Sequence, residues 1–190
     1  MTRADRPTLE QVERELARRD TVGRRLKTAR IVAAVLVVVT AVAVLLATLW
    51  LPVLKVSGTS MSPSLDQGDV VVVVRGSGFD SGDIVAFYYN NKILLKRVIA
   101  GAGDWVDFDS DGNVYVNNVK IDDPYAVGKG EGECDVEFPY QVPEGNWFVL
   151  GDNRSSSVDS RSSQVGCVKD DDVIGRVIIR IYPIGEISAL

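Results

Sequence analysis

Two patterns of hydrophobic positions divide the chain. Residues 31–54 form an unbroken run of 24 residues without a charged side chain. From residue 69 onward the apolar positions fall instead in short runs, several of them alternating with polar residues. A helix of about 20 apolar residues crosses a hydrocarbon core of about 30 Å, whereas short alternating runs are typical of antiparallel strands. The pattern therefore predicts a mainly β protein in which a single N-terminal transmembrane helix precedes an antiparallel β-sheet domain.

Turn-forming residues separate the candidate strands of the later region. The strands are predicted at 70–74, 84–89, 93–99, 105–108, 114–116, 119–121, 147–150 and 173–182. Asp-Ser-Asp-Gly at 109–112 and the pair Asn117-Asn118 are tight-turn signals, which predict a small β-meander over 105–121. Residues 122–146, rich in Gly, Pro and acidic residues, are predicted to form an excursion from the sheet.

Charge is distributed unevenly on the two sides of the apolar run. Residues 1–30 contain nine Lys/Arg against five Asp/Glu, and residues 55–190 contain twelve against twenty-one. Basic residues crowd just before the apolar run, whereas Lys55 is the only one in the twenty residues after it. The positive-inside rule therefore predicts a cytoplasmic basic tail (1–30), a membrane span (31–54) and an extracytoplasmic domain (55–190). A cleaved signal peptide usually has an apolar region of only about 7–15 residues, so that alternative fits less well.

The composition narrows the possible chemistry. The chain contains no histidine, which excludes a Ser-His-Asp triad, a Cys-His dyad and most catalytic zinc sites. A nucleophilic mechanism would need another base, and no metal or cofactor is called for. Cys134 and Cys167 both lie in the extracytoplasmic region, where they could form a disulfide or remain two free thiols.

Lys96 is a candidate for the missing base. A lysine can act as a base if its pKa falls from about 10.4 toward neutrality, and burial among apolar groups produces shifts of that size. On a strand, Lys96 would share its face with Leu94 and Val98, whose side chains would exclude water. The alternative is an edge-strand lysine that only discourages aggregation.

Ser60 is a candidate for the nucleophile. It lies in the polar cluster Ser-Gly-Thr-Ser-Met-Ser-Pro-Ser (57–64), a composition that is otherwise typical of a linker. Six residues separate it from Leu54, at most about 20 Å of extended chain, so it is expected near the bilayer surface. Gly58 would let the backbone turn and bring amide groups near an oxyanion.

Four short motifs follow the apolar run in a fixed order. They are Gly-Thr-Ser-Met-Ser-Pro-Ser-Leu at 58–65, Gly-Asp-Ile-Val-Ala-Phe at 82–87, Lys-Arg-Val-Ile-Ala-Gly-Ala-Gly-Asp at 96–104, and Gly-Asp-Asn-Arg-Ser-Ser-Ser-Val-Asp-Ser-Arg at 151–161. In this combination, over residues 30–182, the chain resembles type I bacterial signal peptidases (leader peptidases). The resemblance implies a membrane-bound serine endopeptidase with a Ser/Lys dyad that removes signal peptides from exported preproteins.

The resemblance also assigns roles to individual residues. Ser60 matches the nucleophile and Lys96 the general base. Ser157 matches a serine that hydrogen-bonds the base, and Asp159 and Arg161 match an ion pair that supports the site. The implied partners are preprotein signal peptides and the lipid bilayer of the cell membrane, with no nucleic acid.

Some positions depart from the family pattern. Gly58 stands where some members place a serine hydroxyl that stabilises the oxyanion, so the oxyanion hole is expected to use the backbone amides of Ser60 and Gly58.

Two other functions are compatible with parts of the sequence. A self-cleaving Ser/Lys repressor would need a DNA-binding domain in place of the apolar run, and a tethered β adhesion module would leave the four motifs as coincidence.

Overall fold

The computed structural model describes residues 9–130 and 132–190, and it divides into two compact units, residues 1–49 and 50–190. Within the described residues, the second unit contains one eight-stranded sheet and one four-stranded sheet, and every strand pair in both is antiparallel. The predicted mainly β domain after an N-terminal helix is therefore confirmed.

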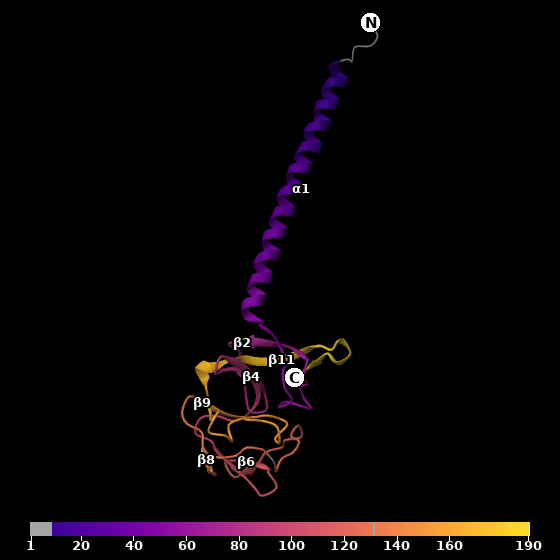
Figure 1. The fold of residues 1–190 in the computed structure, drawn as a ribbon. Helices are drawn as coiled ribbons and strands as arrows, with labels where there is room; N and C mark the ends of the chain where they lie inside the picture. Colours follow the sequence, from indigo (N-terminus) through magenta and orange to yellow (C-terminus); the bar gives the residue numbers. More distant parts are fainter. Residues whose placement is uncertain (1–8, 131) are drawn as a thin grey trace. The chain divides into compact units, whose positions relative to one another are not determined.

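The larger sheet has the strand order β1-β2-β11-β3-β4-β9-β10, with β12 paired to β11. Its strands are β1 (Val53–Lys55), β2 (Val70–Arg75), β3 (Ile84–Tyr89), β4 (Lys92–Ala100), β9 (Asn146–Leu150), β10 (Val168–Lys169), β11 (Val173–Tyr182) and β12 (Ser188–Ala189). Short 3-10 turns at Asp170–Asp172 and Ile184–Glu186 precede β11 and β12. Figure 1 shows β2 and β11 together, at the other end of the domain from β6 and β8.

The smaller sheet has the order β7-β6-β5-β8. Its strands are β5 (Trp105–Phe108), β6 (Val114–Val116), β7 (Val119–Lys120) and β8 (Tyr140–Gln141). Asn117 and Asn118 have φ angles of 52° and 65°, the left-handed values that a two-residue hairpin turn requires. The predicted meander over 105–121 is thus confirmed, and the predicted excursion 122–146 contributes only β8 and the first residue of β9 to the sheets.

All eight predicted strands form. The longer ones follow from their apolar pattern, and the short β6 and β7 follow from the Asn117-Asn118 turn signal between them. The strands that the pattern missed are β1, β8, β10 and β12, each of two or three residues. Such short segments contain no alternation to detect and become strands only because a longer neighbour supplies the hydrogen bonds.

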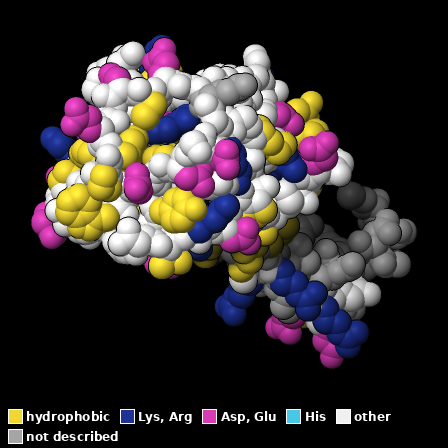
Figure 2. Space-filling model, turned by 90° about the horizontal axis from the view of Figure 1, so that it is seen from below, with side chains coloured by type: hydrophobic (Ala, Val, Ile, Leu, Met, Phe, Trp, Pro, Cys, Tyr) yellow, Lys and Arg dark blue, Asp and Glu magenta, His cyan; other side chains and the backbone are white. Residues whose placement is uncertain are grey.

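The core consists of three groups of buried apolar side chains. One lies among β2, β3, β11 and the segment 56–65, one between the end of β4, β9 and the smaller sheet, and one between β3, β4, β9 and β10. Met61 and Leu65, 2% and 0% exposed, belong to the first group and anchor the loop that contains Ser60. The face of the domain in Figure 2 carries acidic side chains scattered among apolar and basic ones.

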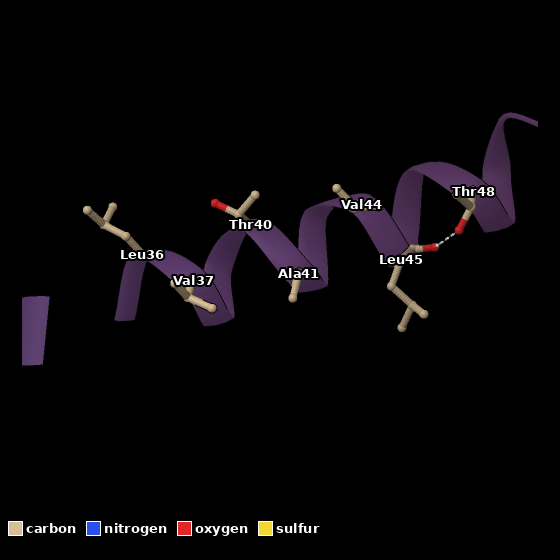
Figure 3. A pocket seen from close by; sticks show the side chains of 7 residues that line it. All are labelled: Leu36, Val37, Thr40, Ala41, Val44, Leu45 and Thr48. Atoms are coloured by element: carbon tan, nitrogen blue, oxygen red, sulfur yellow. Dashed lines mark hydrogen bonds between the residues drawn. The ribbon is translucent and has the colours of Figure 1, made fainter. Parts of the chain in front are cut away.

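The N-terminal unit is helix α1 (Leu9–Trp50), and its apolar part, Arg24–Trp50, is long enough to cross a membrane by length and composition. Side chains such as Leu36, Val44 and Leu45 project outward from it (Figure 3). The hydroxyl of Thr48 donates to the Leu45 carbonyl oxygen at 2.8 Å. The helix ends at Trp50, so the last four residues of the predicted span 31–54 lie outside it. Residues 1–8 of the predicted basic tail lie outside the described residues.

Candidate active site

Ser60 and Lys96 come together although 36 positions separate them in the chain. Lys96 Nζ donates to Ser60 Oγ at 2.8 Å. Lys96 lies in β4 opposite Val85 of β3, and Leu94 and Val98 pack in the same core group as Val85. The strand alternation predicted for Lys96 is therefore correct, and this apolar face leaves only 3% of the residue exposed.

Burial changes the acid-base behaviour of Lys96. Desolvation by burial is the largest influence and lowers the Lys96 pKa from its ordinary 10.5 to about 8, with Asp159 opposing and Arg161 reinforcing the shift. At pH 7 about a tenth of the lysine would be neutral, roughly 300-fold more than for an exposed lysine. A neutral amine within hydrogen-bond distance of a hydroxyl can accept its proton.

The 151–161 motif holds the backbone of Ser60 in place. The amide of Asn153 donates to the Ser60 carbonyl at 3.1 Å. Gly151 lies against the same carbonyl, because a Cβ added at residue 151 would meet Ser60 O at 2.5 Å and would also collide with the Ser157 side chain. Only glycine allows this close approach of the loop containing Ser60 to the 151–161 motif.

Two buried ion pairs brace the site. Arg97 makes a bidentate pair with Asp152, at 2.8 and 2.6 Å, and also donates to the Gly82 carbonyl and the Ser64 hydroxyl. These contacts join residues from all four motifs. The tyrosine ring of Tyr125, from the excursion, lies 4.0 Å from the Arg97 guanidinium carbon.

The second pair is Asp159 and Arg161, with Nε and Oδ1 2.9 Å apart and a further contact of 3.0 Å. Asp159 accepts from the Gly151 amide at 3.0 Å, and Arg161 donates to the Arg154 carbonyl at 2.8 Å. The pair thus holds the glycine that faces Ser60.

Ser157 differs from the expectation that it hydrogen-bonds Lys96. The residue is 2% exposed, and within the described part of the chain its Oγ has no hydrogen-bond partner. Lys96 Nζ donates to Ser60 Oγ instead. Ser157 Oγ is left as an unused hydroxyl packed against Gly151, the glycine that touches Ser60.

Gly58 and Ser60, whose amides are expected to form the oxyanion hole, lie in the same loop. Gly58 has a φ of 89° and nothing within 4 Å of where its Cβ would be. Over the described residues, the amide of Ser60 donates to no acceptor, so it is free to bind a developing negative charge.

Sequence reasoning missed Asp123, Tyr125 and Asn153 at this site. Asp123 forms a buried ion pair with Arg154, and the excursion bridges to the 151–161 motif through Val127, whose amide donates to the Asp152 carbonyl at 2.9 Å. The acidic composition of the excursion gave no indication of these contacts. Both cysteines are free thiols, which resolves the choice left open by the sequence.

A cavity of about 500 Å³ opens beside Ser60. Its walls come from 54–61 on one side and 91–95 on the other. β1 is the edge strand of its sheet, and the first five residues of β4 pair only with β3, because β9 pairs with β4 from Arg97 onward. Two strand segments with unused backbone groups therefore border this cleft.

Comparison with known proteins places this arrangement in a family. The family model described as "Signal peptidase, peptidase S26" matches residues 28–182. The chain belongs to this family and is a serine peptidase.

Individual relatives agree with the family match. The chain is 32% identical to signal peptidase I U of Bacillus subtilis over 143 residues, which cover 69% of this chain and 75% of that protein. It is 34% identical to signal peptidase IB of Staphylococcus aureus over 152 residues, covering 69% and 78%. It is 32% identical to the chloroplastic thylakoidal processing peptidase 1 of Arabidopsis thaliana over 151 residues, covering 70% and 43%. The crystal structure of a signal peptidase I from Enterococcus faecalis aligns with 53% of this chain and 97% of its own, at 34% identity and a TM-score of 0.45.

The contact at Gly151 generates a prediction. Gly151→Ala should reduce kcat about 100-fold, because the added methyl must displace either the Ser60 carbonyl or Ser157, and small misplacements of a nucleophile have effects of that size. The measurement is steady-state cleavage of a peptide substrate. Gly78→Ala is the matched control, since nothing lies within 4 Å of a Cβ there. Equal activity of both variants would show that the close approach is unimportant.

Proposed function

We propose that this chain is a membrane-anchored signal peptidase that uses Ser60 as nucleophile and neutral Lys96 as general base. The observation that carries the proposal is the 2.8 Å contact between Lys96 Nζ and Ser60 Oγ, made by a buried lysine with a pKa of about 8. The relatives carry the names signal peptidase and thylakoidal processing peptidase, which supports preprotein signal peptides as the substrate class.

In the acylation step, neutral Lys96 accepts the Ser60 hydroxyl proton while Oγ attacks the carbonyl carbon after a small residue. The tetrahedral intermediate collapses when the Lys96 ammonium gives its proton to the leaving amine, which becomes the N-terminus of the mature protein. In deacylation, Lys96 takes a proton from water, and the hydroxide attacks the acyl ester. The bond between the acyl carbon and Ser60 Oγ then breaks, the Lys96 ammonium returns its proton to Oγ, and the signal peptide leaves with a C-terminal carboxyl group.

The oxyanion formed in both steps would be held by backbone amides. The amide of Ser60 is the leading donor, because it has no partner among the described residues. Gly58 contributes no side-chain hydroxyl at its position, and its open, left-handed backbone leaves room for the substrate carbonyl and for an amide contribution from this turn.

Ser157 would assist when Lys96 becomes charged. Once Ser60 is acylated, its Oγ is an ester oxygen and a poorer acceptor for the lysine. The Ser157 hydroxyl is buried and uncommitted, so it would give the amine a second acceptor if the lysine side chain turned toward it. Asp159 and Arg161 keep the surrounding backbone in place.

The cleft beside Ser60 would bind the substrate as an extended strand. The free edges of β1 and the first half of β4 offer backbone donors and acceptors on both sides, the arrangement used in strand addition. Small side chains before the scissile bond would fit against Leu95, Val56 and Met61, which line the cleft.

The anchor in this proposal is the apolar part of α1. The segment Arg24–Trp50 is long enough to span a bilayer, and the basic residues at its start favour a cytoplasmic N-terminus. The β domain then acts outside the cytoplasm, where signal peptides emerge.

The dyad is tested by two substitutions in the full chain in detergent. Ser60→Ala and Lys96→Met should each lower the cleavage rate of a preprotein by at least about 1,000-fold, because one removes the nucleophile and the other the base. Ser110→Ala and Lys120→Met are matched controls, since both residues are exposed and lie in the smaller sheet region. A Ser60→Ala or Lys96→Met variant that cleaves at the native rate would contradict the assignment.

The pH dependence provides an independent test. Because only neutral Lys96 can accept a proton, kcat/KM should rise with pH, reach half its maximum near pH 8 and fall about tenfold per pH unit below pH 7. The measurement is kcat/KM between pH 6 and 10, with fluorescence confirming that the protein stays folded. A half-maximum near pH 10 would mean that the base is not desolvated.

Ser157→Ala separates catalytic assistance from structure. Removing an unpartnered buried hydroxyl should leave the melting temperature unchanged or raise it, since no hydrogen bond is lost. The kcat should nevertheless fall, by about tenfold to 100-fold, because the charged lysine loses its second acceptor. Thermal unfolding and steady-state kinetics on the same preparation measure both effects. An unchanged kcat would assign Ser157 to packing alone.

A further inference from the structure

Two lysines line the cleft, one from each of the two segments that form its walls. Lys55 is the last residue of β1 and Lys92 the first residue of β4, and both line the cavity beside Ser60. Both residues are exposed, and neither makes an ion pair within the described part of the chain. The proposed mechanism uses neither of them.

The position of this pair contrasts with the charge of the rest of the domain. Residues 55–190 contain twelve Lys/Arg and twenty-one Asp/Glu. The other cleft residues are apolar or uncharged, apart from these two lysines. Two unpaired cations in an otherwise uncharged cleft produce a local positive potential.

A tight turn just before Lys92 fixes the position of this residue in the cleft. Asn90 and Asn91 have φ angles of 44° and 62°, a tight turn that reverses the chain between β3 and β4. Tyr89 pairs with Lys92 directly across this turn. Lys92 is therefore the first strand residue after a fixed hairpin, and its distance along β4 from Lys96 is set by the strand.

That distance identifies the part of the substrate that the lysines would meet. Lys92 precedes Lys96 by four residues, which is about 13 Å along a strand. In an extended substrate that pairs with the edge of β4, each successive substrate residue lies beside the next residue of β4. Since signal peptidases recognise small residues before the cut, the cleft holds that side of the scissile bond. The residues about four to six positions before the cut then lie between Lys55 and Lys92.

Resting on the proposed function, we propose that Lys55 and Lys92 are specificity-determining residues that favour an acidic substrate side chain about four to six positions before the cleavage site and disfavour a basic one. A glutamate there is attracted by both ammonium groups at the cleft rim, and a lysine is repelled by both. Lys96 lies about 13 Å farther along the strand and does not contribute to this distinction.

The experiment measures kcat/KM for a preprotein with Glu, Gln or Lys at each of positions four to six before the cut, using the full chain in a neutral detergent. The wild type should cleave the Glu substrate about three- to tenfold better than the Lys substrate at the preferred position, the size expected for exposed charge pairs. The ratio should approach one at 1 M salt, where the screening length is about 3 Å.

Charge reversal gives the decisive comparison. Lys92→Glu should invert the order, so that the Lys substrate is cleaved better than the Glu substrate, and Lys55→Glu should shift the ratio in the same direction. A general loss of folding or activity would lower all rates and could not produce this inversion. Lys120→Glu, the same charge change outside the cleft, should keep the wild-type ratio.

The outcomes separate this inference from the proposed function. If the wild type cleaves all three substrates at equal rates at every position, the specificity role is wrong and the peptidase assignment stands. If it cleaves none of them, the proposed function itself fails. If the preference is absent in neutral detergent and the two lysines alter only activation by anionic lipid vesicles, the pair binds lipid headgroups and the substrate inference is overturned.

Discussion

A catalytic lysine must be kept from water and also from any carboxylate that would hold its proton. Lys96 meets both conditions in this fold. The apolar face of β3 and β4 removes the water, and the two carboxylates close enough to raise its pKa, Asp159 and Asp152, are each committed to an arginine. Arg161, bound to Asp159, also lowers the Lys96 pKa directly, so that the pair has opposing influences on the amine. The balance leaves desolvation as the dominant influence, and the Lys96 pKa falls to about 8.

The same ion pairs also hold together the strands and loops that surround Ser60. Each is expensive to bury, and each is stabilised by bidentate geometry and by further hydrogen bonds to backbone carbonyls. Arg97 connects the strand that contains Lys96 to the loop that contains Ser60 through Ser64, and Asp159 accepts from the Gly151 amide. The geometry around Ser60 is therefore set by groups that cannot move without leaving a buried charge unpaired.

The excursion between the two sheets has a larger part in this site than its composition suggests. Asp123 neutralises the buried Arg154, and Tyr125 covers the Arg97 guanidinium on one face. Val127 exchanges backbone hydrogen bonds with the segment that follows Gly151. This irregular segment thus closes over the ion pairs and limits the access of water to them, which strengthens their electrostatic effect on Lys96.

The sequence alone determined the class of fold and the long apolar helix, and it singled out Ser60 and Lys96, which the structure places in contact. Hydrophobic periodicity is local, so eight strands and the face of Lys96 could be read from it, and the ordered motifs distinguished Ser60 from its neighbouring serines. Only the tertiary structure decided which groups meet from distant parts of the chain. The Asn153 amide on Ser60, the cover provided by Tyr125 and the unpartnered hydroxyl of Ser157 all depend on packing between segments that no local pattern relates. The same holds for the short strands β8, β10 and β12 and for the free cysteines, because their state is set by what their neighbours in space supply.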